Sequence, residues 1–415
     1  MAIIRAFRAY RPKPQLADKV AALPYDVMNS IEARDMVKDN PYSFLHIDKA
    51  EIDLPKETDI YDEQVYAKAK ENLEARIADG TYLKEQTACL YIYEQTFRGK
   101  TQTGLVGCAS VDEYQNNKIK KHELTRADKE ADRIHHVDTL NANTGPIFLT
   151  YRKKEEISAL LEVYKENHET LYDFTADDVH QRIWVIAEPA LIAQLQGLFS
   201  KIPALYIADG HHRAASAVRV AERRRKENPD YTGQEEFNFF LAVYFPAEEL
   251  TIMDYNRLVK DLNGQSKAEF LESLSQKFSV QAQGKTPFAP KERHTFGLYL
   301  DHAWYVLSLK EGICDESDPV ASLDASILQK EVLTPLLSIG DPRTDKRIDF
   351  VGGIRGLSEL ERRVESGEMI LAFSMCPVSS EELMQIADAG KIMPPKSTWF
   401  EPKLLSGLFI HFLTD

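Results

Sequence analysis

Cysteine is scarce in this sequence, and no two cysteines have the spacing of a metal or redox motif. The 415 residues include four cysteines, Cys89, Cys108, Cys314 and Cys376, which are scattered along the chain. No C-x-x-C pair occurs, so neither a structural zinc site nor a disulfide framework is indicated. We therefore expect four reduced and mostly buried thiols, as in a cytoplasmic protein.

Long apolar runs are missing as well. The first residues, MAIIRAFRAYRPKP, contain no apolar stretch of the kind found in signal peptides. The longest apolar runs, such as FFLAVYF at 239–245, have the length of a strand and fall far short of the roughly 20 residues that span a bilayer. These absences predict a cytoplasmic protein that does not use a membrane as partner.

The chain has no excess of basic residues. Lys and Arg total 51 against 65 Asp and Glu, which gives a formal net charge of −14. Broad binding to nucleic acid or to anionic membranes is driven by a positive surface, so we exclude both as the main function. The basic run AERRRKE at 221–227 is typical of the solvated C-terminal end of a helix, where the dipole favours cations. A small local anion site remains compatible with this charge.

The sequence also lacks internal repeats, low-complexity tracts and a linker rich in Pro or Gly. A chain of 415 residues exceeds one typical core, so we expect two parts. We place a core with a large insertion at 1–250 and a C-terminal α+β part at 251–415, which contributes a loop to the site. Helical and strand patterns alternate without a strict βαβ rhythm, which indicates a mixed α+β fold.

Two local patterns predict particular structures. The apolar segments 88–97 and 105–114 predict a β-hairpin whose turn is RGKTQTG at 98–104. Ser379 and Glu382 have the spacing of a capping box and predict the start of a helix.

The most unusual stretch is YIADGHHRAA at 206–215, where an apolar strand pattern meets an alanine-rich helix pattern. Asp209 and Gly210 stand where a helix cap and a tight turn belong. The free backbone N–H groups and the positive dipole of such a helix end bind phosphate or carboxylate readily.

The side chains at this corner suit the same kind of ligand. Arg213 can hold a phosphate with two N–H groups, and Asp209 can bind Mg²⁺ through an oxygen. His211 or His212 can hydrogen-bond an oxygen or move a proton. An ordinary helix cap and turn does not require an aspartate, two histidines and an arginine together, so we predict a binding site here.

Motifs spread over nearly the whole chain resemble one family. They are LPYDV (23–27), KKHELT (120–125), NANTGPIF (141–148), ADGHHRAAS (208–216) and MPPKSTWFEPKLLSGL (393–408). Taken together they are specific, and by them the chain is identified as a member of the bacterial and archaeal family catalogued as domain of unknown function 1015. The family name implies no activity.

A more distant resemblance implies one. The DGHHR segment is similar to the Asp-Gly-His-x-Arg signature of free-serine kinases with the ParB/sulfiredoxin-like fold, some of which use ADP as donor. The resemblance implies a ParB/sulfiredoxin-like nucleotide-binding core with large insertions. It also implies that Asp209, Gly210, His211 and Arg213 cradle the donor phosphates and Mg²⁺, while His212 falls on the variable position of the signature.

Phosphoryl transfer also needs a carboxylate near the nucleophile. The Glu that serves in those kinases matches no position here by motif, so three acids stay open: Asp26 in PYDV, Glu32 in the short helix after it, and Glu123 in KHELT. Asp26 also fits a cap or turn, and Glu123 also fits a first-turn helix acid. Their place in the family motifs favours Asp26 and Glu123.

The loop MPPKSTWFEPK at 393–403 is a further candidate. Lys396 and Ser397 suit an anion, while Trp399 and Phe400 suit a base or a subunit contact. A C-terminal arm that packs its aromatic residues into the core would show the same residues. Because family motifs usually gather around one pocket, we predict that Lys396 and Ser397 bind the donor.

Histidines raise the question of a transition-metal site. The candidates are His122, His135, His136, His211 and His212. Zinc sites use close patterns such as H-x-x-x-H on one element, whereas the adjacent histidines of RIHHVD point to different sides of a helix. We therefore predict Mg²⁺ that enters with a nucleotide and is held by Asp209, and no dedicated transition-metal site.

The prediction is a Mg²⁺-dependent small-molecule kinase that uses ADP or ATP and phosphorylates free serine or a similar hydroxylated metabolite. Its expected partners are a nucleotide and a small-molecule substrate, not nucleic acid or a membrane, and a homodimer is compatible with the sequence. Two alternatives stay open: a nucleotide-binding regulator without kinase chemistry, and a phosphoester hydrolase that uses the same corner.

Overall fold

The computed structural model describes residues 2–414 as a mixed α+β protein with two compact units. Unit 1 comprises Met1–Leu250 together with Pro402–Asp415, and unit 2 comprises Thr251–Glu401. The second part was predicted to extend from residue 251 to residue 415, whereas residues 402–415 belong to unit 1. The physical reason is a set of contacts inside unit 1, among them the bond from the Tyr82 hydroxyl to the Gly407 carbonyl (2.8 Å).

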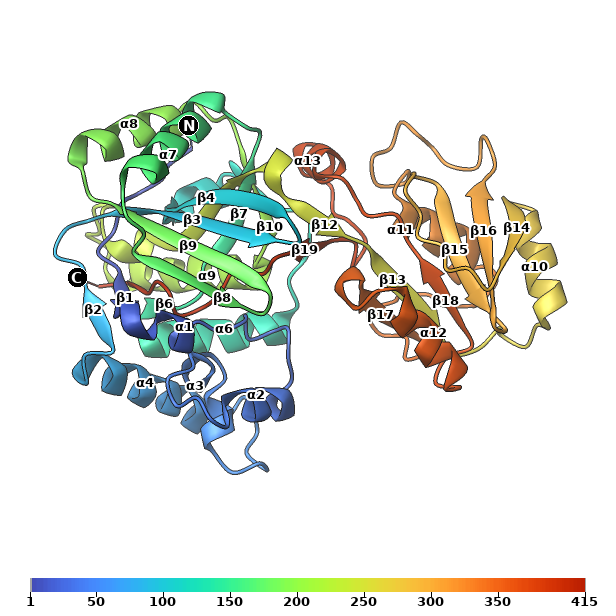
Figure 1. Ribbon diagram of the computed structural model, residues 1–415, viewed down its shortest axis with the longest axis horizontal. Coiled ribbons are helices and arrows are strands. Elements are labelled where there is room, and N and C mark those ends of the chain that lie inside the picture. The colour runs from blue at the N-terminus through green and yellow to red at the C-terminus, as the bar shows by residue number, and fades with distance from the viewer. Residues whose placement is uncertain (1, 415) are drawn as a thin grey trace. The chain divides into compact units, whose positions relative to one another are not determined.

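Unit 1 contains an eight-stranded, largely antiparallel sheet (Figure 1). Across the sheet the strands run in the order β5 (Ile119–Lys120), β10 (Leu205–Asp209), β7 (Ile147–Tyr151), β11 (Phe239–Pro246), β4 (Lys100–Ser110), β3 (Leu90–Phe97), β9 (Val179–Ile186) and β8 (Tyr172–Ala176). Two neighbouring pairs are parallel, β5 with β10 and β7 with β11.

One face of this sheet forms the main core with three helices, α7 (Glu155–Asn167), α8 (Pro189–Phe199) and α9 (His211–Glu227). On the other face the terminal segments of the chain cover β3, where the rings of Phe7 and Phe409 contact Tyr91. Burial of these aromatic rings supplies a large apolar area, which ties the C-terminal segment to unit 1.

A smaller helical layer packs beside the sheet. Its helices are α1 (Ala17–Val20), α2 (Ser30–Val37), α3 (Leu45–Asp48), α4 (Glu63–Ala78) and α6 (Ala127–Leu140). Their apolar faces share one cluster that includes Ile410 from the C-terminal segment. The remaining short elements of unit 1 are α5 (Val111–Gln115) and the strand pairs β1 (Tyr10–Pro12) with β2 (Tyr82–Lys84) and β6 (Ala142–Asn143) with β20 (His411–Phe412).

The predicted hairpin is present as β3 and β4, but its turn is shorter than predicted. The turn residues are Arg98 and Gly99, both with positive φ, and residues 100–104 continue β4. Gly104 was predicted as a turn residue but lies inside β4. A Cβ at this position would lie only 2.7 Å from the Val243 side chain of β11. Close packing between neighbouring strands therefore explains this glycine.

Unit 2 is built on a six-stranded antiparallel sheet in the order β14 (Phe278–Gly284), β16 (Ala303–Leu309), β15 (Thr295–Leu300), β18 (Leu371–Ser374), β13 (Tyr255–Val259) and β17 (Ile348–Gly352). Helices α10 (Lys267–Ser275) and α11 (Asp324–Leu328) share one apolar cluster with the sheet, and α12 (Leu357–Glu365) shares another. Helix α13 (Ser380–Asp388) begins with the predicted capping box of Ser379 and Glu382. Strands β12 (Thr251–Met253) and β19 (Trp399–Glu401) pair with each other.

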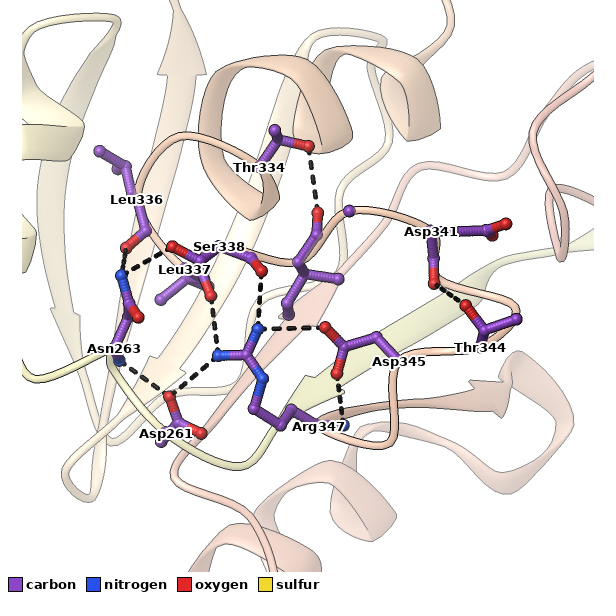
Figure 2. A network of polar contacts seen from close by, with 12 residues as sticks. Asp261, Asn263, Thr334, Leu336, Leu337, Ser338, Asp341, Thr344, Asp345 and Arg347 are labelled. Atoms are coloured by element: carbon purple, nitrogen blue, oxygen red, sulfur yellow. Dashed lines mark hydrogen bonds and ion pairs between the residues drawn. The ribbon is translucent and has the colours of Figure 1, made fainter.

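A polar network in unit 2 fixes the loop that follows the π-helical turn Gln329–Leu333 (Figure 2). Its centre is Arg347, whose guanidinium donates to the carbonyls of Leu337 (3.0 Å) and Ser338 (2.7 Å) and pairs with Asp345 (3.0 Å) and Asp261 (3.5 Å). The guanidinium thus satisfies two backbone carbonyls of this loop.

No helix within residues 2–414 combines the length and the apolar character needed to cross a bilayer.

Candidate functional site

The strand-to-helix corner predicted at 206–215 is present: β10 ends at Asp209, α9 begins at His211, and Gly210 joins them. Gly210 has a φ of +89°, a left-handed conformation that favours glycine. The Arg213 side chain folds back over this glycine, and a Cβ on Gly210 would lie 3.2–3.3 Å from the guanidinium. The N-cap residue Gly210 has no side chain to cap the N–H groups of the first turn of α9, and such groups are able to bind an anion.

Strand β5 lies beside β10 and runs parallel to it, with Lys120 opposite Tyr206. The carboxyl ends of the two strands therefore meet at the same edge of the sheet, the usual place for a ligand in such sheets. The loop after β5 contains the KKHELT motif, which this pairing brings to the corner.

Two cations lie next to the Asp209 carboxylate. Its Oδ2 lies 3.7 Å from Arg213 Nη2 and 3.5 Å from Lys403 Nζ. Burial by itself would raise the pKa of Asp209, but the charges of Lys403 and Arg213 outweigh it and hold the pKa below its ordinary value. Asp209 is therefore a carboxylate over the whole physiological range.

Lys403 reaches the site because the C-terminal segment runs across unit 1. Its backbone carbonyl accepts from Gln95 Nε2 (3.0 Å), and Ser406 exchanges backbone hydrogen bonds with Ala22. Gly407 N donates to the Thr144 carbonyl (3.4 Å). These contacts place the second half of the 393–408 motif beside LPYDV and NANTGPIF.

A narrow cavity of about 20 Å³, room for about one water molecule, lies behind Arg213. Arg213 Nη1 donates to the Pro146 carbonyl (2.6 Å), and Arg133 lies across the cavity with its guanidinium 4.0 Å from the centre of the Tyr25 ring. Arg133 also pairs with Asp132 (2.9 Å), which raises its pKa further although burial opposes this. Two permanent cations therefore line this cavity.

Three residues of the corner form a His–Glu–His cluster: His122, Glu123 and His211. The two imidazole rings meet edge to face with centroids 4.5 Å apart, and His211 Nδ1 lies 3.9 Å from Glu123 Oε2. Burial lowers the pKa of His122 to about 4, and burial together with His122 lowers that of His211 well below its ordinary value. Both rings are therefore neutral at physiological pH.

His212 points elsewhere. Its Nε2 accepts a hydrogen bond from the Arg126 backbone N–H (3.0 Å), which pins the end of the KKHELT loop. Burial lowers the pKa of His212, and the nearby Asp26 carboxylate opposes that shift. Asp26 itself is exposed in the turn before α2 and close enough to His212 to act on its charge.

Other predicted residues lie apart from this cluster or in unit 2. Glu32 completes a capping box, accepting from Asn29 N (2.8 Å), so its role is to begin α2. In unit 2 the buried Ser397 hydroxyl donates to the Pro394 carbonyl (2.7 Å), and the Lys396 ammonium lies 5.4 Å from the centre of the Tyr255 ring.

Three charged residues near the corner were not predicted as site residues. Lys403 belongs to the motif at 393–408, in which Lys396 and Ser397 were predicted to bind the donor. Arg133 and Asp48 line the cavity but belong to helices that carry no motif, and Asp48 accepts from the Thr144 hydroxyl (2.9 Å) of NANTGPIF. Only the folded chain brings these charges next to the motif residues.

The fold and this corner define a mixed α+β protein with a charged site at the end of a buried strand. The chain belongs to the family described as "Protein of unknown function (DUF1015)", whose model matches residues 4–326. No curated protein matches the chain.

Several solved structures are similar over most of their length. A conserved hypothetical protein from Pyrococcus furiosus has 15% identity and a TM-score of 0.35, with 73% of this chain and 94% of that chain covered. A free serine kinase variant in complex with AMP has 13% identity and a TM-score of 0.37, with 71% and 86% covered. SbnI with a C-terminal truncation, from Staphylococcus aureus, has 11% identity and a TM-score of 0.32, with 72% and 85% covered. These TM-scores are too low to establish a shared fold.

Proposed function

We propose that unit 1 is a ParB/sulfiredoxin-like nucleotide-binding core that transfers a phosphoryl group from ADP or ATP to free serine or a similar hydroxylated metabolite. The observation that carries this proposal is the charge set at the start of α9. There Asp209 lies between Arg213 and Lys403 beside N–H groups that no side chain caps. An anion with a bound cation matches this set, because it offers two positive groups and one carboxylate.

The donor phosphates would lie against the first turn of α9. Gly210 has no side chain of its own, so phosphate oxygens can approach the backbone of the turn beside the Arg213 guanidinium that lies over it. Arg213 and Lys403 neutralise the phosphate charge, and neutralisation together with positioning supplies most of the rate in phosphoryl transfer.

The ionised Asp209 is the residue that would hold Mg²⁺. A bound Mg²⁺ ion would bridge donor oxygens and offset charge in the transition state. Asp209 fits this use because it is a carboxylate at physiological pH and sits at the end of β10, directly before the phosphate-binding turn.

The base that takes the acceptor proton would be Asp26 or Glu123. Both flank the corner on loops, Asp26 before α2 and Glu123 before α6, and both side chains are accessible to an acceptor. Within this proposal His211 and His212 line the donor site, and Lys396 and Ser397 are donor-binding candidates to be tested by substitution.

The test incubates the purified chain with Mg²⁺, ADP or ATP, and a pool of free amino acids and polyols. Mass spectrometry then detects new phosphorylated species. The expected product is phosphoserine or a related phosphomonoester, formed by the wild type and reduced at least about 100-fold in Arg213→Ala. The matched control is Arg223→Ala, an exposed position on the same helix, which should retain wild-type turnover.

Each of the other outcomes would contradict the kinase proposal in a different way. Tight nucleotide binding without any phosphorylated product would replace the kinase by a nucleotide-binding regulator. Loss of nucleotide in the absence of an acceptor would indicate a phosphoester hydrolase. Unchanged nucleotide affinity in Arg213→Ala would overturn the assignment of the corner.

A further inference from the structure

The His–Glu–His cluster, His122, Glu123 and His211, has the composition of a metal site that uses two imidazoles and one carboxylate. One ligand atom from each of the three side chains can be chosen so that all lie within 4.8 Å of one another. Sequence spacing hides this cluster, because His122 follows β5 and His211 follows β10 as the first residue of α9. The two residues meet only through the parallel pairing of β5 with β10.

Three of the four ring nitrogens of the two buried imidazoles lack a well-formed hydrogen bond within residues 2–414, although the Ile207 backbone is close enough to raise the pKa of His122. Neither ring nitrogen of His122 nor Nε2 of His211 has a hydrogen-bond partner of normal geometry among the described residues. His122 is 1% exposed and His211 is 6% exposed, so bulk water cannot satisfy these atoms. Buried polar atoms without partners are rare and costly, and a group missing from the structure often satisfies them.

We propose that His122, Glu123 and His211 bind a divalent transition metal of the Zn²⁺ type. Two neutral imidazoles and a carboxylate are ligands that such ions prefer, and three protein ligands leave a position open for water or substrate.

The geometry needs only small movements to close around an ion. Zinc bonds of roughly 2.0–2.1 Å hold the ligand atoms closer together than the present distances. The two imidazoles are buried and fixed by β5 and α9, whereas Glu123 stands on a loop with 42% of its side chain exposed. Rotation of the Glu123 side chain can therefore complete the site.

Charges of both signs act on the two imidazoles. The Asp209 carboxylate raises the pKa of His122 and of His211 against the effect of burial, which favours a cation here. The Lys121 ammonium, 4.2 Å from the centre of the Tyr114 ring, acts on His211 in the opposite direction. If Glu123 binds a metal, Asp26 is left as the carboxylate that could act as general base in the proposed reaction.

The test measures metal binding without nucleotide, so it is independent of the proposed kinase. The full chain is stripped with a chelator and titrated with Co²⁺, whose visible d–d bands report tetrahedral nitrogen and oxygen ligands, and Zn²⁺ is then added in competition. We expect one Co²⁺ per chain, displaced by one Zn²⁺. His122→Ala, His211→Ala and Glu123→Gln should each weaken binding at least about tenfold.

A matched control separates ligands from other histidines. His135→Ala, a substitution of an exposed histidine of α6, should bind like the wild type. Because a buried histidine variant can fail to fold, Glu123→Gln on the accessible loop keeps the test decisive.

Three results would overturn the proposal. They are absence of d–d bands in the wild type, unchanged affinity in Glu123→Gln, and binding that survives His122→Ala but is lost in Cys314→Ser. The last result would place the ion at the more exposed group of His294, Cys314 and Glu316 in unit 2.

Discussion

The Lys403 ammonium lies 3.5 Å from the Asp209 carboxylate, although Lys403 comes from the C-terminal segment and Asp209 from the end of β10. Both side chains are largely covered, with 12% and 30% exposed. The pair fixes the C-terminal segment to the corner that we propose as the phosphate site.

Lys403→Met is expected to destabilise unit 1 by about 1–2 kcal/mol, because the Asp209 carboxylate loses one of the two cations next to it. It should also weaken nucleotide binding, since one of the two cations is gone. Urea unfolding and nucleotide titration measure the two effects. Lys70→Met, an exposed lysine of α4, should change neither by more than about 0.5 kcal/mol. Equal unfolding midpoints for Lys403→Met and wild type would refute the pairing.

Gly210 and Gly197 provide a second prediction with effects of opposite sign. Gly210→Ala forces a left-handed residue to carry a Cβ that lies 3.2 Å from Arg213, so stability should fall by about 1–2 kcal/mol and nucleotide binding should weaken. Gly197→Ala lies inside α8 with nothing within 4 Å of the added methyl, so stability should rise by up to about 1 kcal/mol. Thermal unfolding decides both, and a stabilised Gly210→Ala would contradict the role of the turn.

The strand-to-helix corner could be predicted from the sequence because all of its parts are neighbours in the chain. The strand, the glycine turn and the helix occupy consecutive positions, and the structure confirms their order at Asp209, Gly210 and His211. The same holds for the capping box of Ser379 and Glu382, whose interactions span three residues. Such local rules need no knowledge of the fold.

The rest of the site depends on contacts between distant segments. Lys403 and Arg133 reach the corner only through packing of the C-terminal segment and of α6, and neither leaves a periodic signal in the sequence. The meeting of His122 with His211 depends on β5, a strand of two residues that is too short for an alternating pattern. The spacing of histidines along the sequence does not reveal the proposed metal cluster, because its residues follow two different strands.

Arg347 in unit 2 offers a test of the polar network in Figure 2. Arg347→Met removes the donors to the carbonyls of Leu337 and Ser338, so we expect a lower free energy of unfolding than in the wild type. Arg343→Met is the matched control, because the Arg343 side chain is 57% exposed and pairs with Asp341, two residues before it in the sequence. Urea unfolding of both variants against wild type measures the difference, and equal losses would show that the network does not stabilise the loop.

The buried His136 gives a prediction about pH. Burial and the nearby Arg133 lower its pKa to about 4, against an ordinary value of about 6.5, although Asp48 lies 3.9 Å from its Nε2. Between these values the unfolded chain binds a proton that the folded chain does not, so the free energy of unfolding falls as pH drops from about 6.5 to 4. The shift corresponds to about 3 kcal/mol for this one histidine.

His136→Gln cannot take up that proton, so its stability should depend less steeply on pH over this range. It is also expected to be less stable than wild type at pH 7, since it disturbs the bond between Nε2 and the Ile47 carbonyl (3.1 Å). The neighbouring His135→Gln is the control, because His135 is 53% exposed and should keep the wild-type slope. Urea unfolding at a series of pH values measures the slopes.

His122 and His211 also contribute to the pH dependence of stability in every variant, because burial lowers their pKa as well. A His136→Gln slope equal to that of wild type would mean that His136 is already protonated in the folded chain.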